Sequence, residues 1–580
     1  MLFGLMASAG GCATTRPAPI TKIVDGRVIV TRAVSPDAYE HVARAYLYEE
    51  EERWEDAAVE LQRALPLDDD AAEIRAELAE LFVRVGRLDD AAEQVERSIS
   101  TAPTVEGYLA RAHLAAAKRD RAGELDGLRS AVGAALSDND AEAIERTHLE
   151  LSDAEVGALD VAGALETVRK LETAVPATIK GRLQHAAFAW VFGELDDAEK
   201  ALRGALDIEP ADVDARLMLA ELLAARGDVA GAKTIFEEAI ERADDPLQIA
   251  EAVAGWLVQR GEVAAAGELA DRTTAGVSDV DSLARASALE RAAKRPDRAA
   301  ELATRAEKLG ATPGRAALLE AEAFAAGDDP GRAASVLLGV KPSEPEYIEA
   351  RLRAAELLRE DGKVDAAARA LDEAAGPADG VVHDAASVVS LAIARSLVDE
   401  KRGDAVRAAR RLDEALADAP DDARLVLARA AVDDRRGEWR AALALAEKLL
   451  ARDPRNVEAL NFAGFVAADH AADLPLATKR LQAAVALSPG SGGILDSLGW
   501  VSFRGGNLAA AGTFLEQANR LEPGDPEILG HLGDLYVARH ERDHALDAYR
   551  RALARKPADK LAKEIAERVR NLEAKSAAGR

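Results

Sequence analysis

The sequence predicts an all-α fold in which about fifteen helical hairpins follow one another along 580 residues. An alanine recurs along the chain in steps of 34, as at Ala477, Ala511 and Ala545, with an apolar residue four positions later and a small residue seven positions later. These offsets share one face of an α-helix, so each triplet is the buried stripe of a short helix. A proline usually follows and ends the helix. The clearest triplets with their prolines are Ala477, Leu481, Ala484, Pro489, then Ala511, Leu515, Ala518, Pro523, then Ala545, Tyr549, Ala552, Pro557.

A second helix precedes each triplet. Twelve residues before the leading alanine lies another small residue, such as Ala220 or Gly499. Small residues on both helices let the two axes approach closely, and glycines such as Gly227 and Gly437 in the turn between them supply the backbone freedom that a helix end needs. Each repeat unit is therefore an antiparallel helical hairpin.

These residues resemble the tetratricopeptide repeat (TPR), a helical hairpin with the same repeat length. The last unit matches the family pattern nearly in full, with Leu529, Leu532, Gly533, Tyr536, Ala545, Tyr549, Ala552 and Pro557. The resemblance implies an α-solenoid, a right-handed superhelix longer than one turn, with a concave groove lined mainly by the first helix of each repeat. It implies proteins or peptides as partners, and no cofactor.

The spacing of the repeats also predicts where the array is irregular. The leading positions are 57, 91, 125, 164, 198, 232, 266, 300, 334, 367, 408, 442, 477, 511 and 545. A long step, from position 125 to position 164, follows Leu125, which stands where alanine belongs, and a longer one runs from position 367 to position 408. The longer step contains a cluster of glycine, proline and aspartate, so we predict an inter-stack loop at 376–384 between an N-terminal stack at 35–375 and a C-terminal stack at 385–557.

Both ends of the array carry additional segments. Residues 13–34 predict a polar tether and a β-hairpin, because two β-prone runs flank Asp25-Gly26. A lone hairpin is marginally stable, so we expect it to pack on the first repeat; the alternatives are that it pairs with a partner strand or stays mobile. Residues 558–580 predict a capping helix and tail, because apolar residues recur there with helical spacing at Leu561, Ile565, Val569 and Leu572.

Residues 1–12 are similar to a bacterial lipoprotein signal. They are apolar and small up to Cys12, the only cysteine of the chain. The resemblance implies that Cys12 is lipidated and anchors the protein in the cell envelope, at the outer membrane facing the periplasm. No lysine or arginine precedes the apolar stretch, and Ala9 stands where leucine is usual, so we expect the true start upstream of Met1. The alternative, if this segment is not a signal, is a cytoplasmic protein.

The formal net charge is −29, from 74 basic and 103 acidic residues, and argues against nucleic acid as a partner. We expect the acidic residues on a solvated outer face; a groove for basic partners is the alternative. No run of 18 apolar residues occurs, so the sequence predicts no membrane-spanning helix.

One short segment matches the zinc-hydrolase pattern H-E-x-x-H, with His540, Glu541 and His544. Asp543 holds the repeat position of Asp89, which we expect to be the N-cap of a second helix. His540 then lies in the turn between two helices, and the imidazoles do not share a helical face. We interpret them as surface residues and keep a zinc hydrolase as the remote alternative. Because no other catalytic motif occurs, we predict a protein that is not an enzyme and holds no metal.

Partner-binding residues follow from the family's contact positions. They lie three residues before, one after and four after the small residue of the first helix. In the last three repeats, the candidates carried over are Asn461, Phe465, Asp496, Trp500, Phe503 and Asp534. Trp500 and Phe503 are the strongest, because exposed aromatic residues anchor interfaces. The alternative is that they pack between repeats.

The segment 456–557 is similar to repeat lipoproteins of the bacterial cell envelope. This implies a non-catalytic scaffold, lipid-anchored through Cys12, that binds partner proteins or peptides in its concave groove. The alternative function is a scaffold of an exopolysaccharide secretion apparatus.

Overall fold

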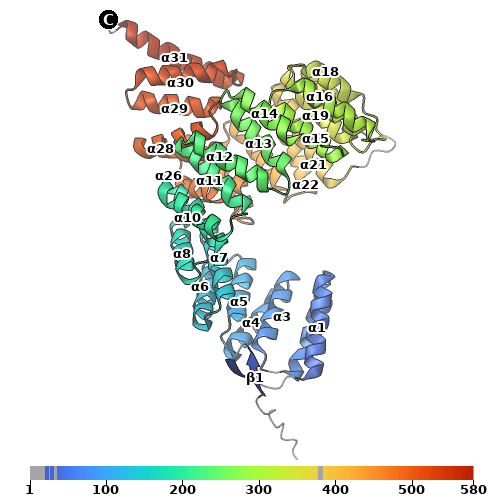
Figure 1. Ribbon diagram of the computed structural model, residues 1–580, viewed down its shortest axis with the longest axis vertical. Coiled ribbons are helices and arrows are strands. Elements are labelled where there is room, and N and C mark those ends of the chain that lie inside the picture. The colour runs from blue at the N-terminus through green and yellow to red at the C-terminus, as the bar shows by residue number, and fades with distance from the viewer. Residues whose placement is uncertain (1–19, 25–26, 32–34, 69, 377–382, 579–580) are drawn as a thin grey trace, which may run out of the picture. The chain divides into compact units, whose positions relative to one another are not determined.

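The computed structural model describes residues 20–24, 27–31, 35–68, 70–376 and 383–578. In this part of the chain, α1 to α30 form fifteen consecutive helical hairpins and α31 follows them (Figure 1). The predicted all-α repeat array and its fifteen repeats are confirmed. The chain divides into two compact units, one ending at Leu151 and the other beginning at Ser152.

The first unit begins with two short antiparallel strands, in which Ile20 lies opposite Thr31 and Val24 opposite Arg27. Three helical hairpins follow, with a buried core that includes Leu61, Leu78 and Phe82. Its elements are β1 (Ile20–Val24), β2 (Arg27–Thr31), α1 (Pro36–Glu50), α2 (Trp54–Ala64), the 3-10 helix η1 (Leu65–Leu67), α3 (Ala72–Arg84), α4 (Leu88–Thr101), α5 (Val105–Ala117) and α6 (Arg121–Asp138); α7 (Ala141–Gly157) crosses into the second unit.

The second unit continues the hairpins from α8 to α30 and ends with α31. Its helices are α8 (Val161–Ala174), α9 (Ile179–Val191), α10 (Leu195–Ile208), α11 (Val213–Arg226), α12 (Val229–Arg242), α13 (Pro246–Gln259), α14 (Val263–Thr273), α15 (Val280–Ala292), α16 (Pro296–Lys308), α17 (Pro313–Ala326), α18 (Pro330–Leu338), α19 (Tyr347–Glu360), α20 (Val364–Ala375), α21 (Ala385–Lys401), α22 (Ala405–Asp418), α23 (Ala423–Arg435), α24 (Trp439–Leu450), α25 (Val457–Asp469), α26 (Leu474–Leu487), α27 (Gly492–Arg504), α28 (Leu508–Leu521), α29 (Pro526–Ala538), α30 (Arg542–Ala554) and α31 (Asp559–Ala578).

The predicted leading positions fall on the second helix of every hairpin, and all but two are buried. The exceptions are Leu125 and Ala300, which are half-buried. In α6 the close-packed residue is Gly127, where an added Cβ would lie 2.8 Å from the Cβ of Ala112. In α16 it is Ala299, with an exposed fraction of 0%. The repeat step is therefore shortened by one residue before α16, not after α18.

The predicted loop between two stacks lies partly outside the described residues, since 377–382 are not described. The helices on either side of it, α20 and α21, pack against each other, and both belong to the second unit. The division between the two compact units coincides with the other irregularity, the step from position 125 to position 164, where α6 and α7 are each longer than most helices of the array.

The second unit closes on itself after one superhelical turn. Helix α9 packs against α26 and α11 against α28, each pair being eight hairpins apart, and Figure 1 shows α11 beside α28. The indole Nε1 of Trp190, which is fully buried, donates a hydrogen bond of 2.8 Å to Oε1 of Gln517. Arg520 Nη1 donates to the carbonyl oxygen of Ala225 at 3.0 Å. Consecutive turns are thus in direct contact.

Helix α31 covers the end of the array. Ile565 of α31 is fully buried against Leu529 and Tyr549, and Leu561, Val569 and Leu572 pack on the same cluster. Among the described residues, no helix combines the length and the apolar composition needed to cross a bilayer.

Candidate functional site

The first helices of the last three complete repeats, α25, α27 and α29, carry the predicted contact residues. Glycine sets how closely each packs on its second helix. A Cβ at Gly464 would lie 2.5 Å from Cγ of Leu481, and one at Gly499 would lie 2.7 Å from Cγ of Leu515. These close approaches fix where the neighbouring side chains of the first helices project.

A histidine joins the contact residues of successive repeats. Nδ1 of His531 donates to Oδ2 of Asp496 at 2.8 Å, and its ring stacks on Trp500 with centroids 4.2 Å apart. Phe465 lies 6.3 Å from the same imidazole, and Phe503 stacks on Trp500 at 5.2 Å. The resulting cluster spans three repeats, and we call it the His531 cluster.

The pKa of His531 reflects this burial and pairing. Burial alone would lower the pKa of the imidazole, but attraction to Asp496 and the hydrogen bond to it, with Glu527 and Asp534 adding, raise the pKa above its ordinary value. Burial also raises the pKa of Glu527 and Glu522. The carboxyl groups around His531 therefore favour the protonated form of its imidazole.

A pocket of about 300 Å³ opens beside the His531 cluster. Four of its lining residues are acidic, and none of those described is lysine or arginine. Asn461 lines this pocket, and its Oδ1 is buried without a hydrogen-bond partner among the described residues. The lining residues are Asn461, Phe465, Ser491, Gly493, Ile494, Asp496, Ser497, Glu522, Asp525, Glu527 and Ile528. An acceptor left unpaired in an acidic pocket suits a ligand that brings hydrogen-bond donors.

The structure brings most, not all, of the predicted contact residues together. Asn461, Phe465 and Asp496 line the pocket. Trp500 is only 8% exposed and packs between repeats, which differs from an exposed anchor. Its Nε1 is buried without a hydrogen-bond partner. Asp534 does not line the pocket; it accepts from the Tyr549 hydroxyl at 2.5 Å and pairs with Arg568 at 3.3 Å.

Sequence reasoning missed His531, Glu522 and Glu527. A signal for His531 exists, because its distance from Asp496 along the chain is close to one repeat, so the two side chains lie on neighbouring first helices. The two glutamates lie at the turn before α29 and in its first turn. Acidic residues there are so common at helix starts that they give no separate signal.

The H-E-x-x-H segment has the arrangement expected from the repeat spacing. His540 lies in the turn between α29 and α30 with a left-handed φ of 63°. His544 lies in the first turn of α30, and its Nδ1 bonds Glu541 at 3.0 Å. No group of three metal-ligating side chains occurs among the described residues. Cys12 lies outside them.

One predicted detail of this segment is wrong. Asp543 and Asp89 are not N-caps; they are the second residues of α30 and α4, whose N-cap positions are Glu541 and Arg87. Neither of these N-cap residues makes a side-chain capping hydrogen bond. The carboxylates in the first turn instead favour the helix start through the helix dipole.

Comparisons with known proteins agree with the repeat architecture. Two family models described as tetratricopeptide repeat match residues 42–106 and 192–255. A TPR repeat-containing protein of Pseudomonas aeruginosa is 29% identical over 194 residues, which are 33% of this chain. The match spans 31% of that relative's length.

Two solved structures are similar to this chain at low identity. One is a tetratricopeptide repeat protein from Parabacteroides merdae, with 14% identity, a TM-score of 0.35, and coverage of 44% of this chain and 98% of that chain. Another is yeast Tom70, with 14% identity, a TM-score of 0.30, and coverage of 93% and 96% respectively.

Proposed function

Because this chain is a tetratricopeptide repeat protein, we propose that it is a scaffold that binds a segment of a partner protein in the pocket beside the His531 cluster. The observation that carries this proposal is the buried, unpaired Oδ1 of Asn461. Buried acceptors are almost always satisfied, so an unpaired one in an open pocket is suited to a ligand's N–H group.

The chemistry of the pocket limits which groups the bound segment of the partner protein carries. Asp496, Glu522, Asp525 and Glu527 give the pocket a negative lining, and Phe465 offers an apolar surface beside it. A polypeptide with backbone N–H groups and a positive or neutral side chain would suit both the negative lining and the apolar surface. An acidic segment would be repelled.

Site-specific photo-crosslinking tests this proposal in the full-length chain. A benzophenone-bearing phenylalanine analogue replaces Phe465, and the matched control carries it at Val406, which is 69% exposed on α22. We expect a discrete adduct from position 465 only, and loss of most of that adduct in the Asn461→Leu background. Equal adducts from both positions, or an adduct indifferent to Asn461→Leu, would contradict the proposed site. Adducts confined to polysaccharide synthesis or export components would favour the secretion-apparatus function.

We also propose that the scaffold is attached to the outer membrane, on its periplasmic side, by a lipid on Cys12. The support is the run of small and apolar residues that ends at this cysteine. Metabolic labelling with a fatty-acid analogue and membrane fractionation check it. We expect label and membrane association to be lost in Cys12→Ser and retained in the control Ala13→Ser. A native chain found wholly in the soluble fraction would refute the anchor.

A further inference from the structure

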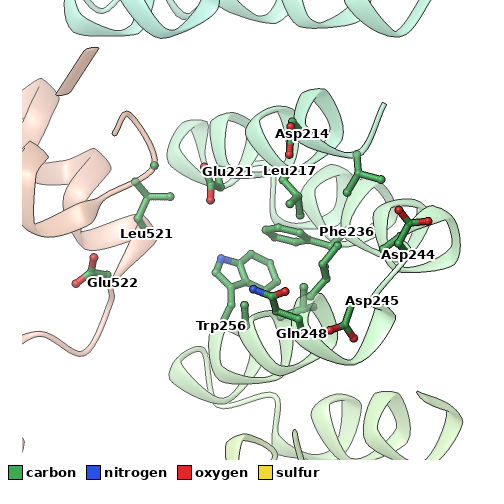
Figure 2. A pocket seen from close by; sticks show the side chains of 16 residues that line it. Asp214, Leu217, Glu221, Phe236, Asp244, Asp245, Gln248, Trp256, Leu521 and Glu522 are labelled. Carbon is green, nitrogen blue, oxygen red and sulfur yellow. The ribbon is translucent and has the colours of Figure 1, made fainter. Parts of the chain in front are cut away.

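A larger pocket lies where the superhelix meets its own next turn. It has a volume of about 650 Å³ and is lined by α11, α12 and α13 on one side and by Gly490, Leu521 and Glu522 on the other. Figure 2 shows Leu521 and Glu522 on a separate segment across from the indole of Trp256. We call it the inter-turn pocket.

The floor of the inter-turn pocket is apolar. Phe236 and Trp256 pack edge to face with centroids 5.3 Å apart, and Leu217, Ile249 and Val253 lie around them. Nε1 of Trp256 is buried and has no hydrogen-bond partner in the part of the chain that the structure describes. The floor thus offers aromatic and aliphatic surface together with one free donor.

The walls of the inter-turn pocket carry charge of one sign. Five of the sixteen lining residues are acidic and none is lysine or arginine; the acidic residues are Asp214, Glu221, Asp244, Asp245 and Glu522. Asp245 pairs with Arg285 at 2.7 Å. Glu221 has no ion-pair partner among the described residues, and burial raises its pKa to about 7.

One cation, Arg260, lies against this floor, and its hydrogen bonds go to backbone carbonyl oxygens. Arg260 lies over the Trp256 ring, 3.9 Å from its centroid. Its Nη1 donates to the carbonyl oxygen of Trp256 at 3.2 Å, and its Nη2 donates to that of Arg520. Arg260 therefore braces the two turns and leaves Glu221 unneutralised.

We propose that the inter-turn pocket binds a partner protein through a lysine or arginine that lies next to an apolar side chain. The apolar side chain packs on Phe236 and Trp256, and the cationic group reaches Glu221. Long basic side chains suit such a site, because their aliphatic stems cover apolar surface while their charged ends pair with carboxylates. The free N–H of Trp256 donates to a carbonyl oxygen of the same segment. This inference rests on the proposed scaffold function but concerns a different pocket.

The inter-turn pocket exists only while the two turns are in contact. Gly490 shows how close they are, since a Cβ on it would lie 2.5 Å from the carboxyl carbon of Glu221. A ligand held by both walls therefore also stabilises the closed turn, because binding to one of two states favours that state.

Peptide binding to the full-length chain tests the proposal. The probe is a fluorescein-labelled, end-capped peptide with an arginine between two leucines, measured by anisotropy at a pH of about 8. Its controls replace the arginine by glutamate, or both leucines by serine. We expect the first peptide to bind, and each control peptide to bind at least tenfold more weakly, because one loses the charge pair and the other loses the apolar contact.

Matched variants locate the binding. Glu221→Gln and Trp256→Leu are expected to weaken binding about tenfold. The controls Glu241→Gln, an exposed residue of α12, and Trp439→Leu, on α24, are expected to leave it unchanged. Glu522 is not substituted, because it lines both pockets. Helix content, measured by circular dichroism, checks that each variant is folded. If Trp256→Leu does not fold, Glu221→Gln alone tests the site.

The outcomes separate this inference from the proposed function. Equal weakening by Glu221→Gln and Glu241→Gln, or no binding of the arginine peptide, overturns the inter-turn site. If position 465 still cross-links in that case, the scaffold function stands. If neither site binds, both proposals fall.

Discussion

At the scale of single residues, the fold of the second unit changes the protonation of one carboxyl group, that of Glu221. Burial raises the pKa of Glu221 to about 7, from an ordinary value of 4.5. The folded state therefore keeps a proton that the unfolded chain releases. The stability that this group contributes is full below a pH of about 4.5 and is lost as the pH rises through about 7.

Replacing Glu221 with glutamine, which imitates the protonated form, should therefore stabilise the second unit only at high pH. We expect Glu221→Gln to raise the free energy of unfolding by about 1–3 kcal/mol at a pH of about 8.5 and to have little effect near pH 5. Urea unfolding followed by circular dichroism measures it, with the exposed Glu241→Gln as control. An equal effect at both pH values would show that charge burial at Glu221 does not matter to folding.

A histidine of the first unit has a dependence of the same sign, in a higher pH range. Hydrogen bonds to Glu150 and Glu80 raise the pKa of His113 to about 10, against the effect of burial. Its stabilising contribution is present below a pH of about 6.5 and disappears as the pH rises towards 10. We expect His113→Asn to destabilise the first unit by about 1 kcal/mol at neutral pH, because 43% of the side chain is exposed and solvent screens the pairs. The loss should vanish above a pH of about 10, as pH-dependent thermal unfolding would reveal; a loss that persists there would point to packing instead.

At the scale of the helical hairpin, the distance between two helices depends on glycine. A Cβ at Gly533 would lie 2.2 Å from Cε1 of Tyr549. That tyrosine is fully buried and its hydroxyl is bound to Asp534, so the ring has little room to move. We expect Gly533→Ala to lower the free energy of unfolding by about 1–3 kcal/mol.

The matched control is a helical glycine whose surroundings leave space for a Cβ. A Cβ at Gly255, inside α13, would meet nothing within 4 Å. Gly255→Ala should therefore stabilise by about 0.5–1 kcal/mol through helix propensity alone. Denaturant unfolding of both variants gives the comparison. If Gly533→Ala also stabilised, the close approach of α29 to α30 would not be a constraint.

Most of the hairpin structure could be predicted from sequence because its cause is local. A buried alanine stripe on a short helix returns in every repeat, so spacing alone gives the helices. The prediction of the leading positions is wrong at Leu125, where Gly127 takes the place of alanine in the long helix α6, and at Ala300, where a repeat step one residue shorter shifts the pattern to Ala299. Such shifts depend on loop packing, which spacing does not encode.

The sites were less predictable. Glu221 follows the small residue Ala220 by one position, the same offset that identified Phe465 and Trp500. This offset alone does not show whether a residue lines a pocket or packs between repeats. Trp500 is packed because His531 of the next repeat stacks on it, and that contact depends on the tilt between neighbouring hairpins.

At the scale of the whole second unit, the array closes after one turn, and this contact joins residues hundreds of positions apart. Trp190 and Gln517 are separated by 327 residues. Each hairpin adds a small rotation, and the sum decides which repeats meet, so a sequence read repeat by repeat cannot show the pairing. The same sum creates the inter-turn pocket.

The contact between consecutive turns leads to a prediction that must be tested by measuring the whole second unit. Gln517→Leu leaves the buried N–H of Trp190 without an acceptor, which should cost about 1–3 kcal/mol. Because that cost falls on the contact between turns, we expect hydrogen exchange to quicken about tenfold or more in α9 and α28 and to stay unchanged in α15 and α16. The double variant with Trp190→Phe, which removes donor and acceptor together, should recover part of the protection. Faster exchange spread evenly over all four helices would mean that Gln517 supports its own repeat and not the closed turn.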